Sequence, residues 1–300
     1  MAPSPWLAAL ADLIDRLGQR HGRHPDWLPG LTLSRASRVT EPLSDISRPV
    51  LALIAQGAKR TVLADRIYNY RAGQYLIATV DLPLTAQVTD APFLGLGLPL
   101  KEQVIADLLL ETSSGTRDDP GDPGEGVLVS DAADDLVSAV TRLLQLAEHP
   151  ADFAVLAPAA EREIHWRLMN GPHAATVRRI GRPGSRVSLV GQAVRWLAEH
   201  FDQPIRIADL AAHVGVSVPT LNRHFRAVTA MSPLQYQKQL RLQRARVELL
   251  ATPGDVAAVG YAVGYDSPSQ FSREYRRQFG APPGQDAARL LTAPAAEAAP

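Results

Sequence analysis

The sequence predicts an α+β protein of two domains, in which a β-rich half with added helices precedes an all-helical half. Two observations support this prediction. Short β-rich runs are confined to residues 31–111, and helical periodicity continues from Val187 to about Phe279. A chain of 300 residues, of which 46% are hydrophobic, is long enough to bury two cores.

Glycine and proline cluster at Gly181, Pro183 and Gly184, which is typical of a domain boundary. We therefore expect an N-terminal domain of residues 1–183 and a C-terminal domain of residues 184–286. The alanine- and proline-rich residues 287–300 should form a disordered tail.

The N-terminal domain should begin with an amphipathic helix, because Leu7, Leu10, Ile14 and Leu17 recur at spacings of three and four. The β-rich runs that follow are PVLALIAQG, KRTVLADRIYNY and QYLIATVDLPLTAQV. Strands about ten residues apart favour a small sheet or barrel. Residues 112–126 are rich in glycine, proline, serine and acids, and predict a solvated loop without a fixed shape.

Helical periodicity resumes over residues 131–149, and a second helix should cover Pro158–Asn170, so helices are expected within 131–170. Leu136, Val140, Leu143 and Ala147 form an apolar stripe on the first of them. This stripe either forms a dimer seam or packs on the chain's own barrel, and its length does not distinguish the two.

Composition excludes several kinds of chemistry. The chain contains no cysteine, which removes disulfides, thiolate nucleophiles and iron–sulfur clusters. Its first residues include acids where a signal peptide has an unbroken apolar core, and no run of 18 apolar residues appears, so we expect no membrane span and a cytoplasmic location. Residues 1–183 hold 18 basic and 22 acidic side chains, whereas residues 184–300 hold 13 and 9, which mildly favours a polyanionic partner for the second half.

The C-terminal half contains an internal repeat. LAAHVGVSVPTLNRHFR at residues 210–226 matches VGYAVGYDSPSQFSREYR at residues 259–276. Each copy predicts a helix-turn-helix. Gly215 and Gly264 permit a left-handed turn, and a serine two or three residues later is suited to cap the next helix. In the first copy, Leu221, Phe225 and Val228 should anchor that helix on its apolar face.

The opposite face of each second helix carries side chains suited to DNA. Arginine bonds bidentately to guanine, asparagine does so to adenine, and serine and flanking arginines suit phosphate oxygens. The candidate DNA-binding residues are Pro219, Thr220, Asn222, Arg223 and Arg226 in the first copy, and Ser269, Gln270, Ser272, Arg273, Arg276 and Arg277 in the second. Ser232-Pro233-Leu234-Gln235 should open a long helix of about Pro233–Leu250 that holds the two copies about 34 Å apart, so that they read two successive major-groove segments.

Residues 187–284 resemble the DNA-binding domain of the AraC/XylS family of transcriptional regulators. The matching segments are IADLA at 207–211, LNRHFR at 221–226, SPLQYQKQLRL at 232–242 and GYDSPSQFSREYRRQFG at 264–280. Two positions depart from the pattern. Gly260 stands where the first copy has Ala211, which should loosen that helix, and Ala230 stands where the family often has glycine, which should tighten or shift the turn.

The segment from Pro42 to Val88 resembles the N-terminal domain of one AraC subgroup. This resemblance implies a cupin-like β-barrel that senses a small molecule, helices that dimerise, and contact with RNA polymerase. Tyr68, Tyr70 and Tyr75 either line the effector pocket or are core and sheet-surface aromatics.

Two other functions remain open: a cupin-type enzyme with an accessory helical domain, and a ligand-independent DNA-binding dimer. Metal catalysis is disfavoured because the strands contain no histidine between Gly30 and Glu111. His21 and His24 lie in a Gly/Pro-rich connector, and His165 and His173 flank a predicted helix end. The chain also lacks a nucleophile elbow, a P-loop and a dinucleotide fingerprint, so we expect no enzyme, metal or cofactor.

Overall fold

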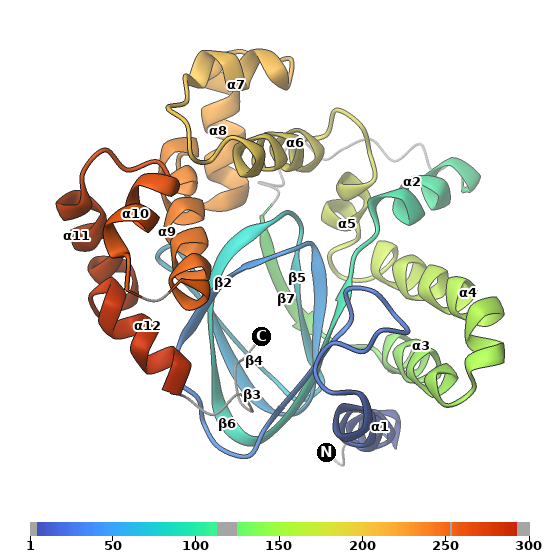
Figure 1. The fold of residues 1–300 in the computed structure, drawn as a ribbon. Helices are drawn as coiled ribbons and strands as arrows, with labels where there is room; N and C mark the ends of the chain where they lie inside the picture. Colours follow the sequence, from blue (N-terminus) through green and yellow to red (C-terminus); the bar gives the residue numbers. More distant parts are fainter. Residues whose placement is uncertain (1–4, 113–124, 253, 293–300) are drawn as a thin grey trace.

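The computed structural model describes residues 5–112, 125–252 and 254–292, and combines a curled antiparallel sheet with helices (Figure 1). The predicted α+β architecture, with a β-sheet domain followed by an all-helical domain, is confirmed. The predicted loop at residues 112–126 lies almost wholly outside the described residues.

Seven strands form one sheet with the order β1-β6-β3-β5-β7, while β2 pairs with β6 and β4 pairs with β3. Every pairing is antiparallel. The strands are β1 Thr32–Ala36, β2 Leu43–Ser47, β3 Val50–Leu63, β4 Arg66–Arg71, β5 Gln74–Ala78, β6 Leu82–Pro99 and β7 Val127–Asp131. The long strands β3 and β6 each pair with different neighbours at their two ends, so they form two walls from one sheet.

The sheet curls at a bulge in β3. The pairing of β3 with β6 shifts register between Ile54 and Lys59. Gly57, at the bulge, has a φ of +79°, and a Cβ atom there would lie 2.5 Å from the carbonyl oxygen of Asp90. Only glycine fits this close approach, and the resulting bend wraps the sheet around a cavity.

The helices of the N-terminal half pack against the sheet and against one another. They are α1 Pro5–His21, α2 Glu102–Glu111, α3 Asp134–Gln145, a short 3₁₀ turn at Leu146–Glu148, α4 Pro150–Met169 and α5 Ala174–Ile180. Three expectations were wrong here: α2 is a helix within the β-rich segment, β7 is a strand where none was expected, and α4 begins at Pro150 rather than Pro158. Pro158 is tolerated inside α4 because it and Ala154 are exposed, so water can satisfy the carbonyl that loses its helical bond.

The apolar stripe of α3 faces the chain's own core. Leu136, Val140 and Leu143 are buried, and α3 packs against α1 and α4. The dimer-seam interpretation of this stripe is therefore wrong, because α1 and α4 already cover it.

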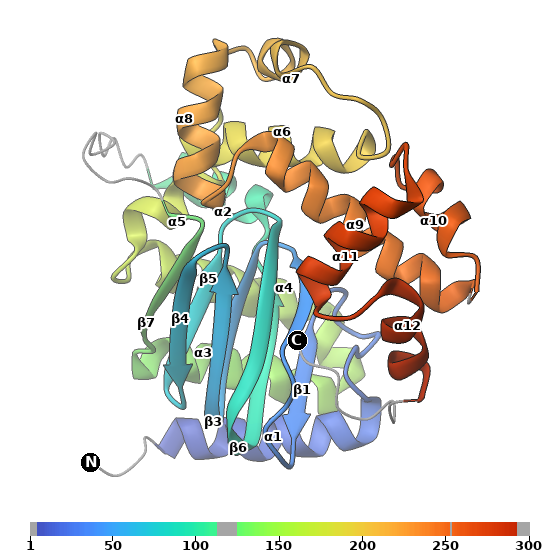
Figure 2. The ribbon, with the colours of Figure 1, turned by 90° about the vertical axis from the view of Figure 1, so that its left-hand side faces the viewer.

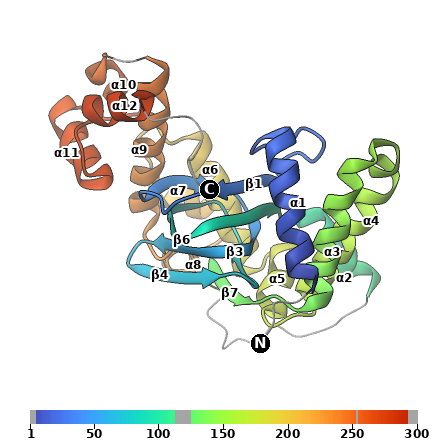
Figure 3. The same cartoon turned by 90° about the horizontal axis from the view of Figure 1, so that it is seen from below.

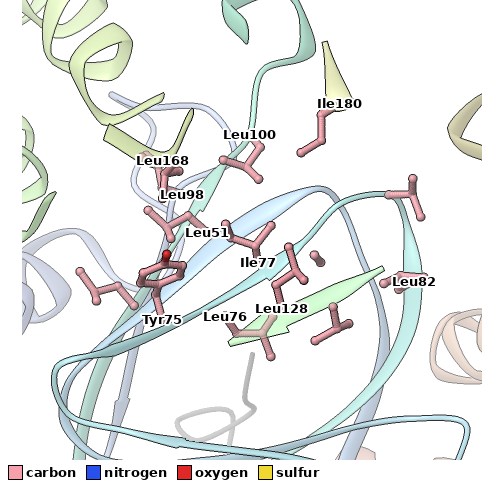
Figure 4. Packing of buried hydrophobic residues seen from close by; sticks show 14 of the residues in the cluster. Leu51, Tyr75, Leu76, Ile77, Leu82, Leu98, Leu100, Leu128, Leu168 and Ile180 are labelled. Carbon is pink, nitrogen blue, oxygen red and sulfur yellow. The ribbon is translucent and has the colours of Figure 1, made fainter. Parts of the chain in front are cut away.

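The core continues from these helices into the sheet. Leu168 of α4 lies near Leu98 and Leu51 of the sheet, and Ile180 of α5 lies on the side of Leu100, just after β6 (Figure 4). All of these residues belong to one buried cluster. This packing fixes α4 and α5 on the sheet.

The C-terminal helices are α6 Arg186–Glu199, α7 Ile207–His213, α8 Val218–Thr229, α9 Pro233–Ala251, α10 Val256–Ala262, α11 Pro268–Phe279 and α12 Pro283–Thr292. The start of the disordered tail at residue 287 was predicted wrongly, since α12 continues to Thr292 and Ala287 is buried. Residues 293–300 lie outside the described part of the chain.

The helices surround the sheet on several sides. Helices α6, α7 and α8 lie beyond one end of the sheet and α1 crosses the other (Figure 2). Helices α10–α12 and the pair α3–α4 lie on opposite sides of it (Figure 3). Of the helices described, none has the length and apolar character needed to cross a bilayer.

Candidate nucleic-acid interface and effector cavity

Two helix-turn-helix units, α7–α8 and α10–α11, follow the predicted repeat. Gly215 and Gly264 adopt positive φ angles of +71° and +88° in the two turns, as expected. Ser217 and Ser267 cap the second helices, each accepting from the backbone N–H three residues later at 3.4 Å.

Aromatic side chains anchor the second helices. Phe225 in α8 is fully buried and packs edge-to-face on Tyr236 of α9, with ring centroids 5.5 Å apart. At the matching position of α11, Tyr275 is also fully buried, and its hydroxyl donates to the carboxylate of Asp286 in α12 at 2.9 Å. Each unit therefore has its own anchor, an apolar one in α8 and a hydrogen-bonded one in α11.

The departure at Gly260 is explained by its neighbour. A Cβ atom on Gly260 would lie 3.0 Å from the ring of Phe271, tighter than ordinary contact. In the first unit the matching pair is Ala211 and Leu221, both buried. The second unit thus pairs a smaller residue with a larger one, which keeps the packing of the two helices similar.

Helix α9 joins the two units and is held at its start and near its middle. Ser232 and Gln235 form the predicted capping box. The guanidinium of Arg241, near the middle of α9, donates to the carbonyl oxygens of Phe201 at 2.7 Å and Gly264 at 2.6 Å, which ties α9 to the α6–α7 connection and to the turn of the second unit.

A buried charge network closes the second unit. Asp286, whose side chain is fully buried, accepts from Arg246 of α9 at 2.9 and 3.3 Å and from Arg289 at 3.0 Å. Burial works against the charged carboxylate, but these arginines outweigh it and hold the pKa of Asp286 below its ordinary value. The network connects α9, α11 and α12.

The candidate DNA-binding residues lie on the outer faces of α8 and α11. The exposed members are Pro219, Asn222, Arg223, Arg226, Ser269, Gln270, Arg273, Arg276 and Arg277, while Thr220 and Ser272 are half-buried. Each set is brought together on one helix, opposite the side that carries its buried anchor.

The electrostatics of these faces favour an anion. Within the described residues, none of the five arginines has a carboxylate within 4.0 Å. Glu274, the acid in α11, instead binds the ammonium of Lys238 at 3.0 Å and the hydroxyl of Tyr265 at 2.9 Å. The arginine charge therefore remains available to phosphate oxygens and base edges.

A separate site lies inside the curled sheet. A cavity of about 490 Å³ is lined by strands β1–β6 and the connector before β1. Its volume is within the range of about 300–1,000 Å³ that is usual for small-molecule sites. Most lining residues are apolar, among them Leu53, Ile54, Leu84 and Phe93.

One of the three predicted tyrosines reaches this cavity. Tyr70 lines it, and burial raises the pKa of this phenol to about 12. Tyr68 is half-buried on β4, and Tyr75 is buried in the core near Leu168; neither lines the cavity. The tyrosines therefore do not form one site.

The four histidines considered as candidate ligands, out of eight in the sequence, do not come together. His165 lies inside α4 rather than at its end. Its Nε2 accepts from the backbone N–H of Lys101 at 3.0 Å. Nε2 of His173 contacts the carbonyl of Val129 at 3.1 Å, and the ring of His21 packs on Trp27. Among the residues that the structure describes, no three His, Asp or Glu side chains form a metal-binding group.

Sequence reasoning missed Lys59, a cavity-lining cation that is only 6% exposed. Lysine in a strand is usually taken as solvent-facing, and here the bulge between Ile54 and Lys59 interrupts the alternation that would reveal its direction. Beyond the bulge the alternation is regular, and Lys59, Thr61 and Leu63 occupy every second position of β3. Thr61 and Leu63 are buried, so the side chain of Lys59 points to the same inner face.

The two domains are in direct contact. The carbonyl of Asp81, just before β6, accepts from the hydroxyl of Tyr236 in α9 at 2.8 Å. A Cβ atom on Gly126 would lie 2.0 Å from the carbonyl oxygen of Val228, so only glycine allows the end of α8 this close to the sheet. These contacts connect the cavity-bearing domain to α8 and α9.

Paired helix-turn-helix units beside a sheet with an internal cavity define a DNA-binding protein with a separate ligand-sized site. Residues 27–176 match the family model of the AraC-type transcriptional regulator N-terminus, and residues 210–289 match a helix-turn-helix domain model. The chain belongs to the AraC/XylS family of transcriptional regulators.

Individual relatives agree with this assignment. The chain is 35% identical to the regulator CdhR of Pseudomonas aeruginosa over 153 residues, which cover 51% of this chain and 43% of CdhR. It is 37% identical to SoxS of Escherichia coli over 106 residues, 35% of this chain and 99% of SoxS. The match thus spans less than half of CdhR. The solved structure of ToxT from Vibrio cholerae has the same fold, with a TM-score of 0.57, 10% identity, and coverage of 87% of this chain and 98% of ToxT.

Proposed function

We propose that this protein is a one-component transcriptional regulator that acts in the cytoplasm. Its C-terminal domain, from residue 184 through α12, binds double-stranded DNA, and its domain of residues 1–183 binds a small-molecule effector. The observation that carries the proposal is the pair of exposed arginine faces on α8 and α11, neither of which is neutralised by an acid among the described residues.

DNA binding would place α8 and α11 in two successive major-groove segments. Asn222 and Arg223 on α8, and Ser272 and Arg273 on α11, occupy the central positions of the two outer faces. Arg226, Arg276 and Arg277 follow at the C-terminal ends and suit phosphate oxygens. The bonds of Arg241 to the α6–α7 connection and to the turn between α10 and α11 support a rigid spacing of the two helices.

Selection of bound DNA from a random pool tests this function. The purified full-length chain should recover two conserved half-sites about one helical turn apart. The variant Arg223→Ala should lose preference in one half-site, and Arg273→Ala in the other. Recovery of sequences without a motif by the wild-type chain would contradict sequence-specific regulation.

The cavity favours an effector-responsive regulator over a ligand-independent DNA-binding dimer. A solved ToxT structure is described as bound to a substituted butenoic acid, which supports a small-molecule site in a protein of this fold. The effector would act by binding one arrangement of the two domains more tightly than another. The contacts of Tyr236 with Asp81 and of Gly126 with Val228 would transmit this change from the cavity-bearing domain to α8 and α9.

We also propose a homodimer and contact with RNA polymerase. The exposed apolar side chains of Val155 and Leu156 on α4 and Leu110 on α2 offer surface for a second copy. Sedimentation of the full-length chain, with and without its selected DNA, measures the oligomeric state. A monomer at micromolar concentration in both conditions would contradict the dimer.

A further inference from the structure

Lys59 is the one buried charged side chain among the described residues that line the cavity. The other lining residues with an ionic or imidazole side chain are His24, Asp45 and Arg48, and all three are exposed. Lys59 is 6% exposed, and the ring centroid of Phe93 lies 6.0 Å from its ammonium. A buried ammonium without an anionic partner is costly.

Among the described residues, no carboxylate or hydrogen-bond acceptor compensates this charge. Within the described residues, the ammonium of Lys59 has neither a hydrogen bond nor an ion pair. The neighbouring cation is Arg23, in the connector before β1, whose buried Nε atom also lacks a hydrogen-bond partner there. Burial, and secondarily repulsion from Arg23, lower the pKa of Lys59 to about 7. Two cations with unmet bonding capacity therefore lie close together beside an otherwise apolar cavity.

We propose that the cavity binds a small apolar monocarboxylate whose charged end pairs with the ammonium of Lys59. The carboxylate supplies the missing acceptors, and the apolar body lies against Leu53, Ile54, Leu84 and Phe93. Threonine and tyrosine hydroxyls of Thr61 and Tyr70 line the same cavity and can donate to the second carboxylate oxygen. This inference deepens the proposed function, since it names the chemical class of the effector.

Specificity follows from the same arrangement. A neutral ligand of the same shape leaves Lys59 unpaired, and a cationic ligand adds repulsion from both Lys59 and Arg23. The cavity should therefore bind an acid more tightly than the corresponding alcohol, because both make the same apolar contacts and only the acid pairs with Lys59. The charge of Lys59 also destabilises the empty protein, so removing it should stabilise the unliganded chain while abolishing recognition of the acid.

Thermal unfolding of the full-length protein tests the site directly. Three acids, decanoate, 4-phenylbutyrate and 1-naphthaleneacetate, are compared with their corresponding primary alcohols and with decyltrimethylammonium at equal submillimolar concentrations. We expect at least one acid to raise the melting temperature by about 3 °C or more, and its alcohol and the cation by less than about 1 °C. Lys59→Met should melt at the wild-type temperature or higher and bind the effective acid at least about tenfold more weakly.

Arg60→Met is the matched control, because Arg60 is the next cation on β3 and is exposed. It should retain the full response to the acid. An alcohol that stabilises as well as its acid, a Lys59→Met variant that keeps the response, or no response to any of the three acids would each overturn the proposal. Affinity for the selected DNA, measured in parallel, distinguishes carboxylate binding at Lys59 from the effector role. An acid that binds at Lys59 without changing DNA affinity would support the carboxylate site and refute the effector role.

Discussion

The hydroxyl of Tyr236 in α9 donates to the backbone carbonyl of Asp81, a residue 155 positions earlier, across a distance of 2.8 Å. Tyr236 is fully buried and also packs on Phe225, the anchor of α8. One side chain therefore contacts both the N-terminal domain, just before β6, and the core of the first helix-turn-helix unit. A movement of the backbone at Asp81 would therefore displace Tyr236 and, with it, the packing of α8 on α9.

Removing this hydroxyl should weaken the domain contact alone. Tyr236→Phe retains the ring that packs on Phe225 but leaves the carbonyl of Asp81 without its donor, so we expect the free energy of unfolding to fall by about 1–3 kcal/mol. Urea denaturation measures this change. Gly126→Ala, which forces α8 away from the sheet, should act in the same direction, and an unchanged stability in both variants would show that the domains do not depend on this contact.

Arginines on the two recognition helices should contribute separately. Arg223→Ala and Arg273→Ala should each reduce affinity for the selected site by about 1–3 kcal/mol and relax the preference at one base pair. Binding to a panel of single-base variants measures both effects. Arg60→Ala, an exposed arginine of the barrel, serves as the control. A loss that is equal on all sequences, with a smaller salt dependence, would instead assign the arginine to phosphate.

The sequence predicted the C-terminal domain far better than the N-terminal one. Glycine, serine and the aromatic anchor recur at fixed spacing because each answers a local requirement, as Gly215 does for a left-handed turn. The sheet is held by pairings between distant segments, and the bulge at Gly57 changes which side chains face inward. The burial of Lys59 and the contact of Tyr236 with Asp81 depend on such long-range packing, so no local sequence pattern predicts them.

Ala230 ends α8 in the left-handed conformation, with a φ of 59°, where Gly280 ends α11 with a φ of 78°. The Cβ atom of alanine is strained there. Ala230→Gly should therefore raise the free energy of unfolding by about 0.5–1 kcal/mol, whereas Gly280→Ala should lower it by about 1 kcal/mol. Denaturation of the two variants under the same conditions gives the comparison, and a loss of stability in Ala230→Gly would contradict the assignment.

The carboxylate of Asp286 should be essential to the second unit. Arg246→Met leaves it buried with Arg289 as its remaining described cationic partner, and we expect a loss of about 3–5 kcal/mol at neutral pH. Because the pKa of Asp286 is held low, its stabilising effect is present above about pH 4 and is lost as the pH falls through its folded pKa. The difference between wild type and Asp286→Asn should shrink accordingly in acid, and a constant difference would show that the charge is not what stabilises α12.

The pH dependence of stability should reveal Lys59 in the unliganded protein. With a pKa of about 7 in the folded chain and an ordinary value of 10.5, the unfolded chain binds a proton that the folded chain lacks between these pH values. The contribution of Lys59 to the free energy of unfolding therefore rises with pH across this window, and stays at its lowest value below it, where both chains hold the proton.

Lys59→Met should be more stable than the wild type at pH 7, and this advantage should narrow by about 2 kcal/mol by pH 9. Urea denaturation of both proteins at the two pH values measures the change. The other charged or titratable groups around the site are common to both proteins and cancel in the difference; they are Arg23, His24, Asp45, Arg48 and Tyr70. Parallel pH profiles would mean that Lys59 keeps an ordinary pKa, because water or a protein group then solvates its ammonium.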